Sequence, residues 1–319
     1  MRNDRGFALL AVMLVLALLG VVVTEFAVSM RLEASMVRSY RDGVVATHLA
    51  EAAVQQGIRE ILGPGDVQAL DVDATLVFFR APAGSASPVS LPKLPRERVQ
   101  LGAGEFSYRI TDEESRININ TAAPDRVDRL LTAVGLDKQA RDIINDSLQD
   151  WKDADDLHRI NGAESEDYYL KLPVPYRARN AALQDTAELL QIRGVTQEIY
   201  KGTQGHPGLA DLVTVMGRDT VNVNTAPESV LKALGLSVAE VGDITQARAS
   251  QPYTAVPARF AGRGLAVGSV TFRIEAEGLI AGKARARIVA IVQRRAGPPT
   301  GASAPATRVA VLSWRPAER

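Results

Sequence analysis

The sequence predicts an α+β fold in which a long N-terminal helix packs on an antiparallel sheet interrupted by a large inserted helical domain. Two observations support this prediction. An apolar run that opens at Phe7 continues as an amphipathic helical pattern as far as Gly63. Alternating strand patterns then lie on both sides of about 150 residues of helical pattern, which is typical of one sheet split by an insertion. The content of 46% hydrophobic and 23% charged residues excludes disordered, collagen-like and multi-span membrane proteins.

The first predicted element is a helix over residues 7–62, of which residues 7–30 form a transmembrane segment. Phe7 to Thr24 carry no charge, and at about 1.5 Å per residue they span most of a hydrocarbon core of roughly 30 Å. Two arginines in the leader, residues 1–6, favour a cytoplasmic N-terminus. A secretory signal peptide is the alternative, but no A-x-A cleavage pattern follows the apolar run.

Strand patterns predict a discontinuous sheet domain made of residues 63–115 and 266–319. The predicted strands cover residues 74–79, 105–111, 270–278, 284–294 and 308–314. The stretch 81–98 contains four prolines with glycine and serine and is predicted to be a loop. Residues 116–265, between the two halves, form the predicted insert.

The insert contains an internal repeat. Arg116–Pro124, which reads RININTAAP, returns as TVNVNTAP over residues 220–227, and each copy is followed by a short amphipathic helix that ends at Gly135 or Gly235. We expect the Asn and Thr side chains to cap the helix N-termini and the glycines to end the helices. Asp185–Gly194 is predicted to be a third helical unit.

Charge and cysteine content exclude several classes of protein. Lys plus Arg and Asp plus Glu both number 37, and this zero balance argues against a chain that mainly coats nucleic acid. Cysteine is absent, which excludes disulfides, zinc-thiolate sites and cysteine nucleophiles. The chain has no GxxxxGK[ST], HExxH or G-x-S-x-G motif, so a membrane-anchored hydrolase is the least favoured class and we expect no catalysis.

One acidic cluster, residues 146–167, has the composition of a metal site. It contains eight acidic and two basic residues, a net charge of −6. Calcium takes six to eight oxygen ligands in irregular geometry, and many like charges repel one another without a cation. Composition alone favours a solvated acidic loop, and the spacing is not that of an EF-hand. His158 lies in this loop, but a single histidine among carboxylates does not indicate zinc.

The N-terminus resembles the class III signal of type IV pilins and type II secretion pseudopilins. A short basic leader ends at Gly6, and Phe7 opens the apolar helix. The resemblance implies that a prepilin peptidase cuts between Gly6 and Phe7 and methylates the new N-terminus. Most members have glutamate at the fifth mature position, which is Ala11 here. This departure resembles the K class of minor pseudopilins and implies a place at the fibre tip, where no neighbouring N-terminal amine needs a carboxylate.

The repeats resemble helix-hairpin-helix, or SAM-like, modules, which often bind DNA backbones. Their turns here, Gly135-Leu136-Asp137 and Gly235-Leu236-Ser237, lack the basic residues that phosphate contacts need. We therefore favour a scaffold for protein contacts.

The acidic cluster resembles the K-class signature D-W-x-D-x-D followed by G-A-E, a region in which that class binds calcium. With the resemblance, calcium is favoured over a solvated loop. The predicted ligands, with Asp150 and Glu166 ranked behind the first four, are Asp153, Asp155, Glu164, Asp167, Asp150 and Glu166.

Together these resemblances imply a pilin-like fold and a K-class minor pseudopilin. Such a protein is a single-pass inner-membrane protein with its bulk in the periplasm, and it nucleates or caps a periplasmic fibre that exports folded proteins. The implied partners are the I and J classes of minor pseudopilin, the major pseudopilin fibre, the inner-membrane assembly platform and the prepilin peptidase. The alternative function is a membrane-anchored helix-hairpin-helix DNA-binding protein of a competence apparatus.

Overall fold

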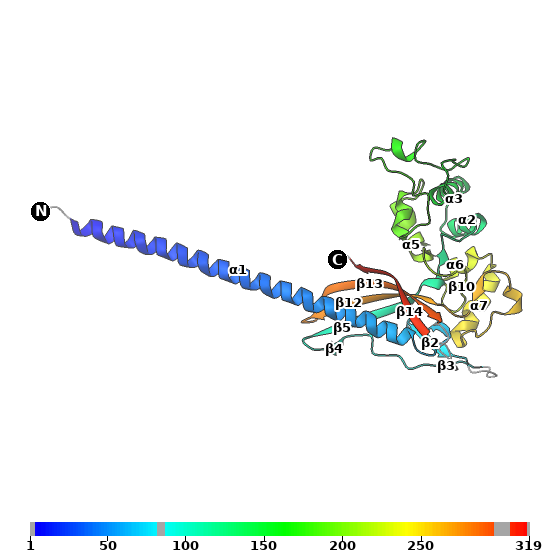
Figure 1. Cartoon of the computed structure of the whole chain (residues 1–319), viewed down its shortest axis with the longest axis horizontal. Helices are drawn as coiled ribbons and strands as arrows, with labels where there is room; N and C mark the ends of the chain where they lie inside the picture. Colours follow the sequence, from blue (N-terminus) through cyan, green and yellow to red (C-terminus); the bar gives the residue numbers. More distant parts are fainter. Residues whose placement is uncertain (1–3, 82–86, 297–306, 318–319) are drawn as a thin grey trace.

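A helix much longer than any other described element dominates the computed structural model, which describes residues 4–81, 87–296 and 307–317 (Figure 1). Helix α1 runs from Asp4 to Ile61. Its described residues are exposed as far as Arg41, and complete burial begins at Ala46. The helix begins inside the predicted leader, since Asp4 to Gly6 belong to it, while residues 1–3 lie outside the described part of the chain.

The C-terminal part of α1 covers one face of a five-stranded sheet, as the strand alternation predicts. The sheet has the order β14-β13-β12-β5-β4. Its strands are β4 (Val99–Leu101), β5 (Gly104–Asp112), β12 (Thr271–Ile280), β13 (Lys283–Ala296) and β14 (Thr307–Pro316). The core between helix and sheet contains Leu49, Ala53 and Val54 of α1 packed with Phe272 and Ile274 of β12. The predicted α+β fold with a long N-terminal helix on an antiparallel sheet is therefore confirmed.

Strands from before and after the insert are direct neighbours in this sheet. β5 pairs antiparallel with β12, and Asp112 at the end of β5 lies opposite Phe272. β12 and β13 form the hairpin that the pattern around Gly282 predicts. Residues 113–270 thus leave the sheet and return to it at adjacent strand ends.

Helix and sheet touch most closely at Gly278. A Cβ atom at this position would lie 1.8 Å from the backbone oxygen of Ala46. Only glycine permits this approach, because any side chain would push the helix backbone away from β12.

A second, three-stranded sheet packs beside the end of α1. It consists of β1 (Val67–Leu70), β2 (Leu76–Arg80) and β3 (Val89–Ser90), in the order β1-β2-β3. β2 matches the strand predicted at residues 74–79, with a shift of two residues at its start. β1 and β3 were not predicted, and β3 lies within the stretch predicted to be a loop. Two residues are too few to show an alternating pattern.

The insert lies at the end of the sheet remote from the N-terminus of α1 (Figure 1). Its α-helices are α2 (Pro124–Ala133), α3 (Lys138–Lys152), α4 (Gln197–Lys201), α5 (Leu209–Leu212), α6 (Glu228–Ala233) and α7 (Val238–Ser250). Helices α2 and α6, which follow the two repeat copies, pack against each other. Their contact lies in a separate hydrophobic core that includes Leu130, Leu131, Val230 and Leu231.

Short strands and 3-10 turns occupy much of the insert between these helices. The strands are β6 (Ile117–Asn118), β7 (Gly202–Thr203), β8 (His206–Pro207), β9 (Val213–Thr214), β10 (Val221–Asn222) and β11 (Leu265–Ala266). The 3-10 turns are η1 (Glu113–Ser115), η2 (Tyr169–Lys171), η3 (Thr186–Gln191) and η4 (Ala258–Phe260). The third unit, predicted as a helix over Asp185–Gly194, is therefore a 3-10 turn with an Asp185 capping box.

The two repeat copies form the same local structure, but the predicted capping role of their Asn and Thr side chains is wrong. The N-cap positions are Ala123 and Pro227, and neither helix receives a side-chain cap. Instead, the first Asn of each motif accepts a bond from the N–H two residues on, Asn118 from Asn120 at 3.1 Å and Asn222 from Asn224 at 3.0 Å. The motif therefore forms an Asx turn that ends before the helix begins. Several residues lie between each Asn and the first turn of the helix, so its side chain does not reach the free N–H groups there.

Gly135 and Gly235 end the two helices as predicted. Their φ angles are 93° and 83°, which is the left-handed region that favours glycine after a helix. The N–H of Leu136 reaches back to the carbonyl of Leu131 at 3.2 Å, the bond of a Schellman motif.

Candidate functional site

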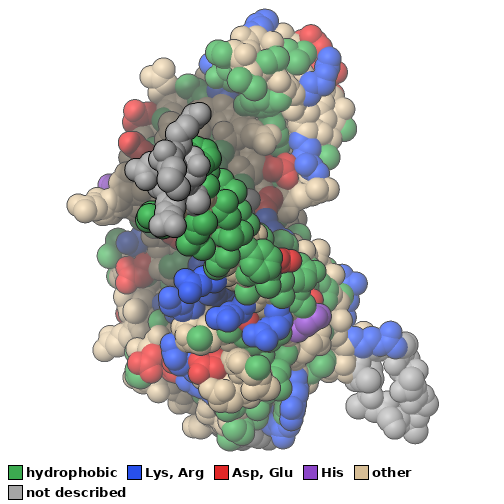
Figure 2. All heavy atoms as spheres, turned by 90° about the vertical axis from the view of Figure 1, so that its left-hand side faces the viewer, with side chains coloured by type: hydrophobic (Ala, Val, Ile, Leu, Met, Phe, Trp, Pro, Cys, Tyr) green, Lys and Arg blue, Asp and Glu red, His purple; other side chains and the backbone are tan. Residues whose placement is uncertain are grey.

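The exposed half of α1 is the largest unpartnered apolar surface of the described chain. Leu9 to Ile61 contain a window with a mean hydropathy of 2.6, and no part of that window is buried. Figure 2, which looks toward the N-terminal side of the molecule, shows hydrophobic side chains along this helix above a group of basic ones. A surface of this length and apolarity is suited to contact with a bilayer or with other apolar helices.

The predicted processing site lies at the start of this helix. Gly6 belongs to α1, and the Phe7 side chain is 80% exposed. Because Asp4 to Gly6 continue the helix, the structure places the Gly6–Phe7 bond within regular helical backbone.

The acidic cluster folds around Asp150, at the end of α3. Asp150 is fully buried and accepts bonds from both the backbone and the side chain of Arg159. One guanidinium nitrogen, Nη1 of Arg159, lies 2.6 Å from Asp150 Oδ1 and 2.7 Å from Asp153 Oδ2. Burial raises the pKa of Asp150, and the bonds from Arg159 oppose this rise.

The turn that follows closes tightly on the same carboxylate. The N–H of Gly162 donates to the carbonyl of Arg159 at 3.0 Å, and a Cβ at Gly162 would lie 1.8 Å from Asp150 Oδ2. Gly162 is thus required for the loop to approach Asp150, which gives a physical reason for the glycine of the signature.

Glu164 is the most unusual carboxylate of the cluster. It is 2% exposed, and neither of its carboxylate oxygens has a hydrogen-bond partner of normal geometry. Burial raises its pKa to about 7 against a lowering effect of the Ser165 N–H, and the charges of Asp150, Asp153 and Asp156 add to the rise. A third oxygen of the cluster, Asp153 Oδ1, is also buried without a partner. Buried carboxylate oxygens without donors are suited to coordinate a cation.

The remaining predicted ligands have protein partners of their own. Asp155 accepts the N–H of Leu157 at 2.9 Å, and Asp167 accepts the N–H of Glu164 at 2.9 Å. Glu166 is exposed and pairs with Arg177 at 3.2 Å. Within residues 4–81, 87–296 and 307–317, no three acidic or histidine side chains form a ready-made metal cluster. Of the predicted ligands, Asp150 and Asp153 share the guanidinium of Arg159, and the buried Glu164 is close enough for both charges to act on it. The other three lie at the margin.

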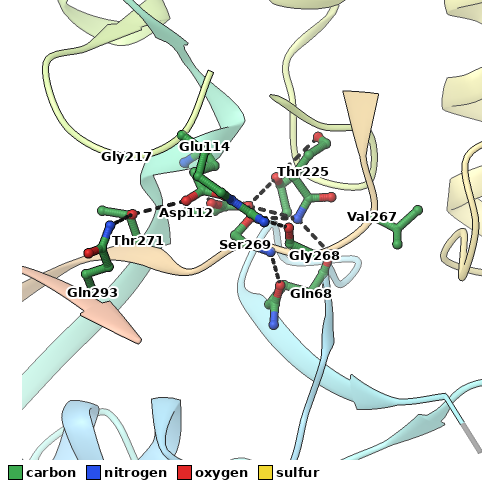
Figure 3. A network of polar contacts seen from close by, with 12 residues as sticks. Gln68, Asp112, Glu114, Gly217, Thr225, Val267, Gly268, Ser269, Thr271 and Gln293 are labelled. Atoms are coloured by element: carbon green, nitrogen blue, oxygen red, sulfur yellow. Dashed lines mark hydrogen bonds and ion pairs between the residues drawn. The ribbon is translucent and has the colours of Figure 1, made fainter. Parts of the chain in front are cut away.

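A second polar site, which sequence reasoning missed, fastens the insert to the sheet (Figure 3). Asp112 at the end of β5 accepts bonds from Asn222 at 2.9 Å, Thr225 at 2.6 Å and Ser269 at 2.6 Å. Burial raises the pKa of Asp112 to about 6, although these donors oppose the rise. Two of the donors belong to the second repeat copy, so the N-x-N-T motif is itself part of the junction.

Two neighbouring carboxylates complete this junction. Glu113 is buried and binds Arg273 at 2.5 Å and Thr214 at 2.5 Å. Glu114 is also buried and accepts a bond from Arg218 at 2.7 Å. The sequence carried one signal for this junction, which is the run of three acidic residues 112–114 directly after the strand predicted over residues 105–111. Acidic residues beside a buried strand are rarely buried themselves unless they are paired, so the run indicates that partners lie nearby.

The helix hairpins of the insert offer little to a nucleic acid backbone. Near Gly235, Arg129 donates to the carbonyl of Ala233 at 2.9 Å and Arg263 donates to that of Gly235. Arg126 binds the Asp219 carboxylate at 2.9 Å. These bonds hold the two repeat units together. The three arginines line one pocket beside Gly235, where the Asp125 and Asp219 carboxylates offset part of their charge.

Comparisons with known proteins agree with one another. A family model described as "Type II secretion system (T2SS), protein K" matches residues 108–206. Type II secretion system protein K of Pectobacterium carotovorum subsp. carotovorum is 29% identical over 267 residues, which are 77% of this chain and 74% of that protein. The protein K of Pseudomonas aeruginosa is 28% identical over 251 residues, 73% of this chain and 68% of that protein.

A solved structure shares the fold. The chain resembles one in the crystal structure of the GspK-GspI-GspJ complex from enterotoxigenic Escherichia coli, with a TM-score of 0.58 and 19% identity over 90% of this chain and 100% of that chain. At this identity the likeness concerns the fold alone.

Proposed function

On the premise that this chain belongs to the family of type II secretion system protein K and is a minor pseudopilin, we propose that it occupies the tip of the periplasmic pseudopilus. The observation that carries this proposal is the position of the insert at the end of the molecule remote from the N-terminus of α1 (Figure 1). The exposed helix remains available for packing against other subunits, while the insert stands where a further subunit would stack. The protein then nucleates or caps the fibre and catalyses no reaction.

Removal of the insert tests the capping role. Because Asp112 and Phe272 are paired across β5 and β12, a short Gly-Ser turn in place of residues 116–265 keeps the two strands in register. A cap without its insert should permit longer fibres when the major pseudopilin is overproduced. Unchanged fibre length, with the shortened variant present in the fibres, contradicts the proposal.

We propose the I and J classes of minor pseudopilin as direct partners. The support is the solved complex of a protein with this fold, which contains GspI and GspJ. The full chain in detergent should co-purify with both proteins at micromolar concentration. Absence of the complex under conditions in which the I and J proteins associate with each other argues against this assignment. The major pseudopilin and the inner-membrane assembly platform are further proposed partners.

We propose that α1 is the inner-membrane anchor, with the N-terminus in the cytoplasm and the bulk of the chain in the periplasm. The exposed apolar half of the helix and the arginines of the leader support this topology. A prepilin peptidase then cleaves between Gly6 and Phe7 and methylates Phe7. The mass of the mature N-terminal peptide tests this step, since a chain that keeps residues 1–6 in cells with active peptidase contradicts it.

We propose calcium as the cation of the acidic cluster. Glu164 and Asp153 supply buried oxygens without donors, and Asp150 lies beside them. Asp155, Asp167 and Glu166 lie at the margin of this group. Bound calcium would neutralise the clustered charge and hold the loop after α3 against the rest of the insert.

Melting temperatures in calcium and in chelator test this assignment, since a ligand that binds only the native state stabilises it. Calcium should raise the melting temperature of the wild-type chain and of Glu166→Gln, which changes an exposed carboxylate in the same loop. Glu164→Gln should lose the response. A wild-type chain that melts at the same temperature in calcium and in chelator contradicts the calcium site.

A further inference from the structure

Arg159 occupies the centre of the acidic cluster. Its Nη1 bridges Asp150 and Asp153 at 2.6 and 2.7 Å. The side chain of Asp150 is 0% exposed and that of Asp153 is 29% exposed. A single positive group thus reaches two of the three carboxylates that converge here.

Charge accounting explains why one guanidinium is insufficient. Asp150, Asp153 and Glu164 would carry three negative charges. Arg159 supplies one positive charge in direct contact, and Lys152 acts on Asp153 from a distance while its ammonium donates to the carbonyl of Ile119. Glu164 receives no bond from Arg159, and its oxygens have no other partner of normal geometry. Glu164 therefore leaves two buried oxygens without donors after Arg159 has bound, and a cation that reached them would relieve the cost of their burial.

On the basis of the proposed calcium site, we propose that the Arg159 side chain competes with the cation for the same carboxylates. Arg159 holds the cluster together when calcium is absent, and its guanidinium moves away when calcium binds. A divalent cation cannot take Asp150 Oδ1 and Asp153 Oδ2 as ligands while the same guanidinium nitrogen lies between them. Calcium therefore binds only after these charge-assisted bonds break. Arg159 lowers the affinity for calcium and stabilises the calcium-free insert.

The backbone and the side chain of Arg159 bind Asp150 through different groups, so the support of the turn and the competition for the cation can be tested apart. The N–H of Arg159 also binds Asp150, at 3.1 Å from Oδ2, and any residue at this position supplies the same donor. The Arg159 side chain is 43% exposed, so the guanidinium has an open path to solvent. Substitution of the side chain therefore keeps the turn and removes the competing charge.

The test compares Arg159→Gln with Arg177→Gln in the full chain in detergent. Arg177 pairs with Glu166 at the margin of the same loop, so both variants lose one positive charge near the cluster. Isothermal titration with calcium should show a Kd at least about tenfold lower for Arg159→Gln, because two charge-assisted bonds to the ligands no longer have to break and about tenfold corresponds to one of them. Arg177→Gln should change Kd by less than about threefold, as expected for an exposed pair. In chelator, Arg159→Gln should melt below the wild-type chain.

Two results overturn the inference while the calcium site stands. One is an equal change of Kd in both variants, which would reflect general electrostatics. The other is weaker calcium binding by Arg159→Gln, which would make Arg159 a residue that positions the ligands. Absence of calcium binding in the wild-type chain and in both variants overturns the calcium site together with the inference, so the two failures are distinguishable.

Discussion

Replacement of Asp112 by asparagine is expected to remove a defined part of the pH dependence of folding. The pKa of this carboxyl is about 6 in the folded chain against 3.8 as its ordinary value. The folded state therefore holds the proton more tightly, and stability from this group rises as the pH falls through 6. About two pKa units at ~1.36 kcal/mol each correspond to about 3 kcal/mol, which is reached in full only below the unfolded pKa.

The effect is already measurable under mild conditions. At about pH 5 the native carboxyl is mostly protonated and the unfolded one mostly ionised, which gives about 1.4 kcal/mol relative to pH 7.5. Asparagine does not titrate. When the pH is lowered from about 7.5 to about 5, the free energy of unfolding of the wild type should therefore rise by this amount relative to that of Asp112→Asn. The difference between the two proteins cancels the contribution of Glu164, which lies in the insert and is unchanged in both proteins.

Urea unfolding at about pH 5, 6 and 7.5 is the assay. A fragment of residues 31–319 suits it, because the removed part of α1 has no buried residue among those that the structure describes. Asp125→Asn is the matched control, since the Asp125 side chain is 67% exposed. A difference between wild type and Asp112→Asn that stays constant within about 0.5 kcal/mol over this range refutes the reasoning.

Two further predictions concern close approach and the repeat motif. Gly278→Ala should destabilise the same fragment by about 3 kcal/mol, because its Cβ would lie 1.8 Å from the Ala46 backbone oxygen. The control is Gly242→Ala on α7, which has open space around it and should stabilise the fragment by about 0.5–1 kcal/mol. Both are measured by urea unfolding, and similar values for the two variants contradict the packing argument. Asn224→Ala should cost about 2–3 kcal/mol, because Asn224 is 2% exposed and exchanges bonds with both the N–H and the carbonyl of Tyr253. Melting of this variant at the wild-type temperature would show that the Asn side chain does not hold the loop.

The elements that the sequence predicts correctly are those with a long local period. Helix α1 and strands β5, β12, β13 and β14 each carry an apolar pattern over seven or more residues. Such a pattern reports which face is buried, so it predicts both the element and its packing side. The unpredicted strands β1 and β3, of four and two residues, have no comparable signal.

The Asn side chains of the repeat were assigned the wrong role for a different reason. N-x-N-T before a helix has the composition of an N-cap, yet the Asn side chains close a turn and bind distant carbonyls, such as Asn120 to Leu183 and Val215. Composition near a helix start indicates that polar groups are needed there. Which backbone groups those side chains satisfy depends on the loops that pack nearby.

The sequence by itself determined the long apolar helix, the split sheet, the repeat and the position of an acidic cluster, because each is written in local periodicity or composition. Tertiary structure decided which carboxylates act together. Arg159 reaches Asp150 because the turn through Gly162 closes on the end of α3, and Glu164 is buried where the charge of Asp150 acts on it. Asp112 meets its donors because β5 and β12 are neighbours although 159 residues lie between Asp112 and its partner Phe272. Burial and partner geometry, which determine what a carboxylate can bind, exist only after these distant segments have come together.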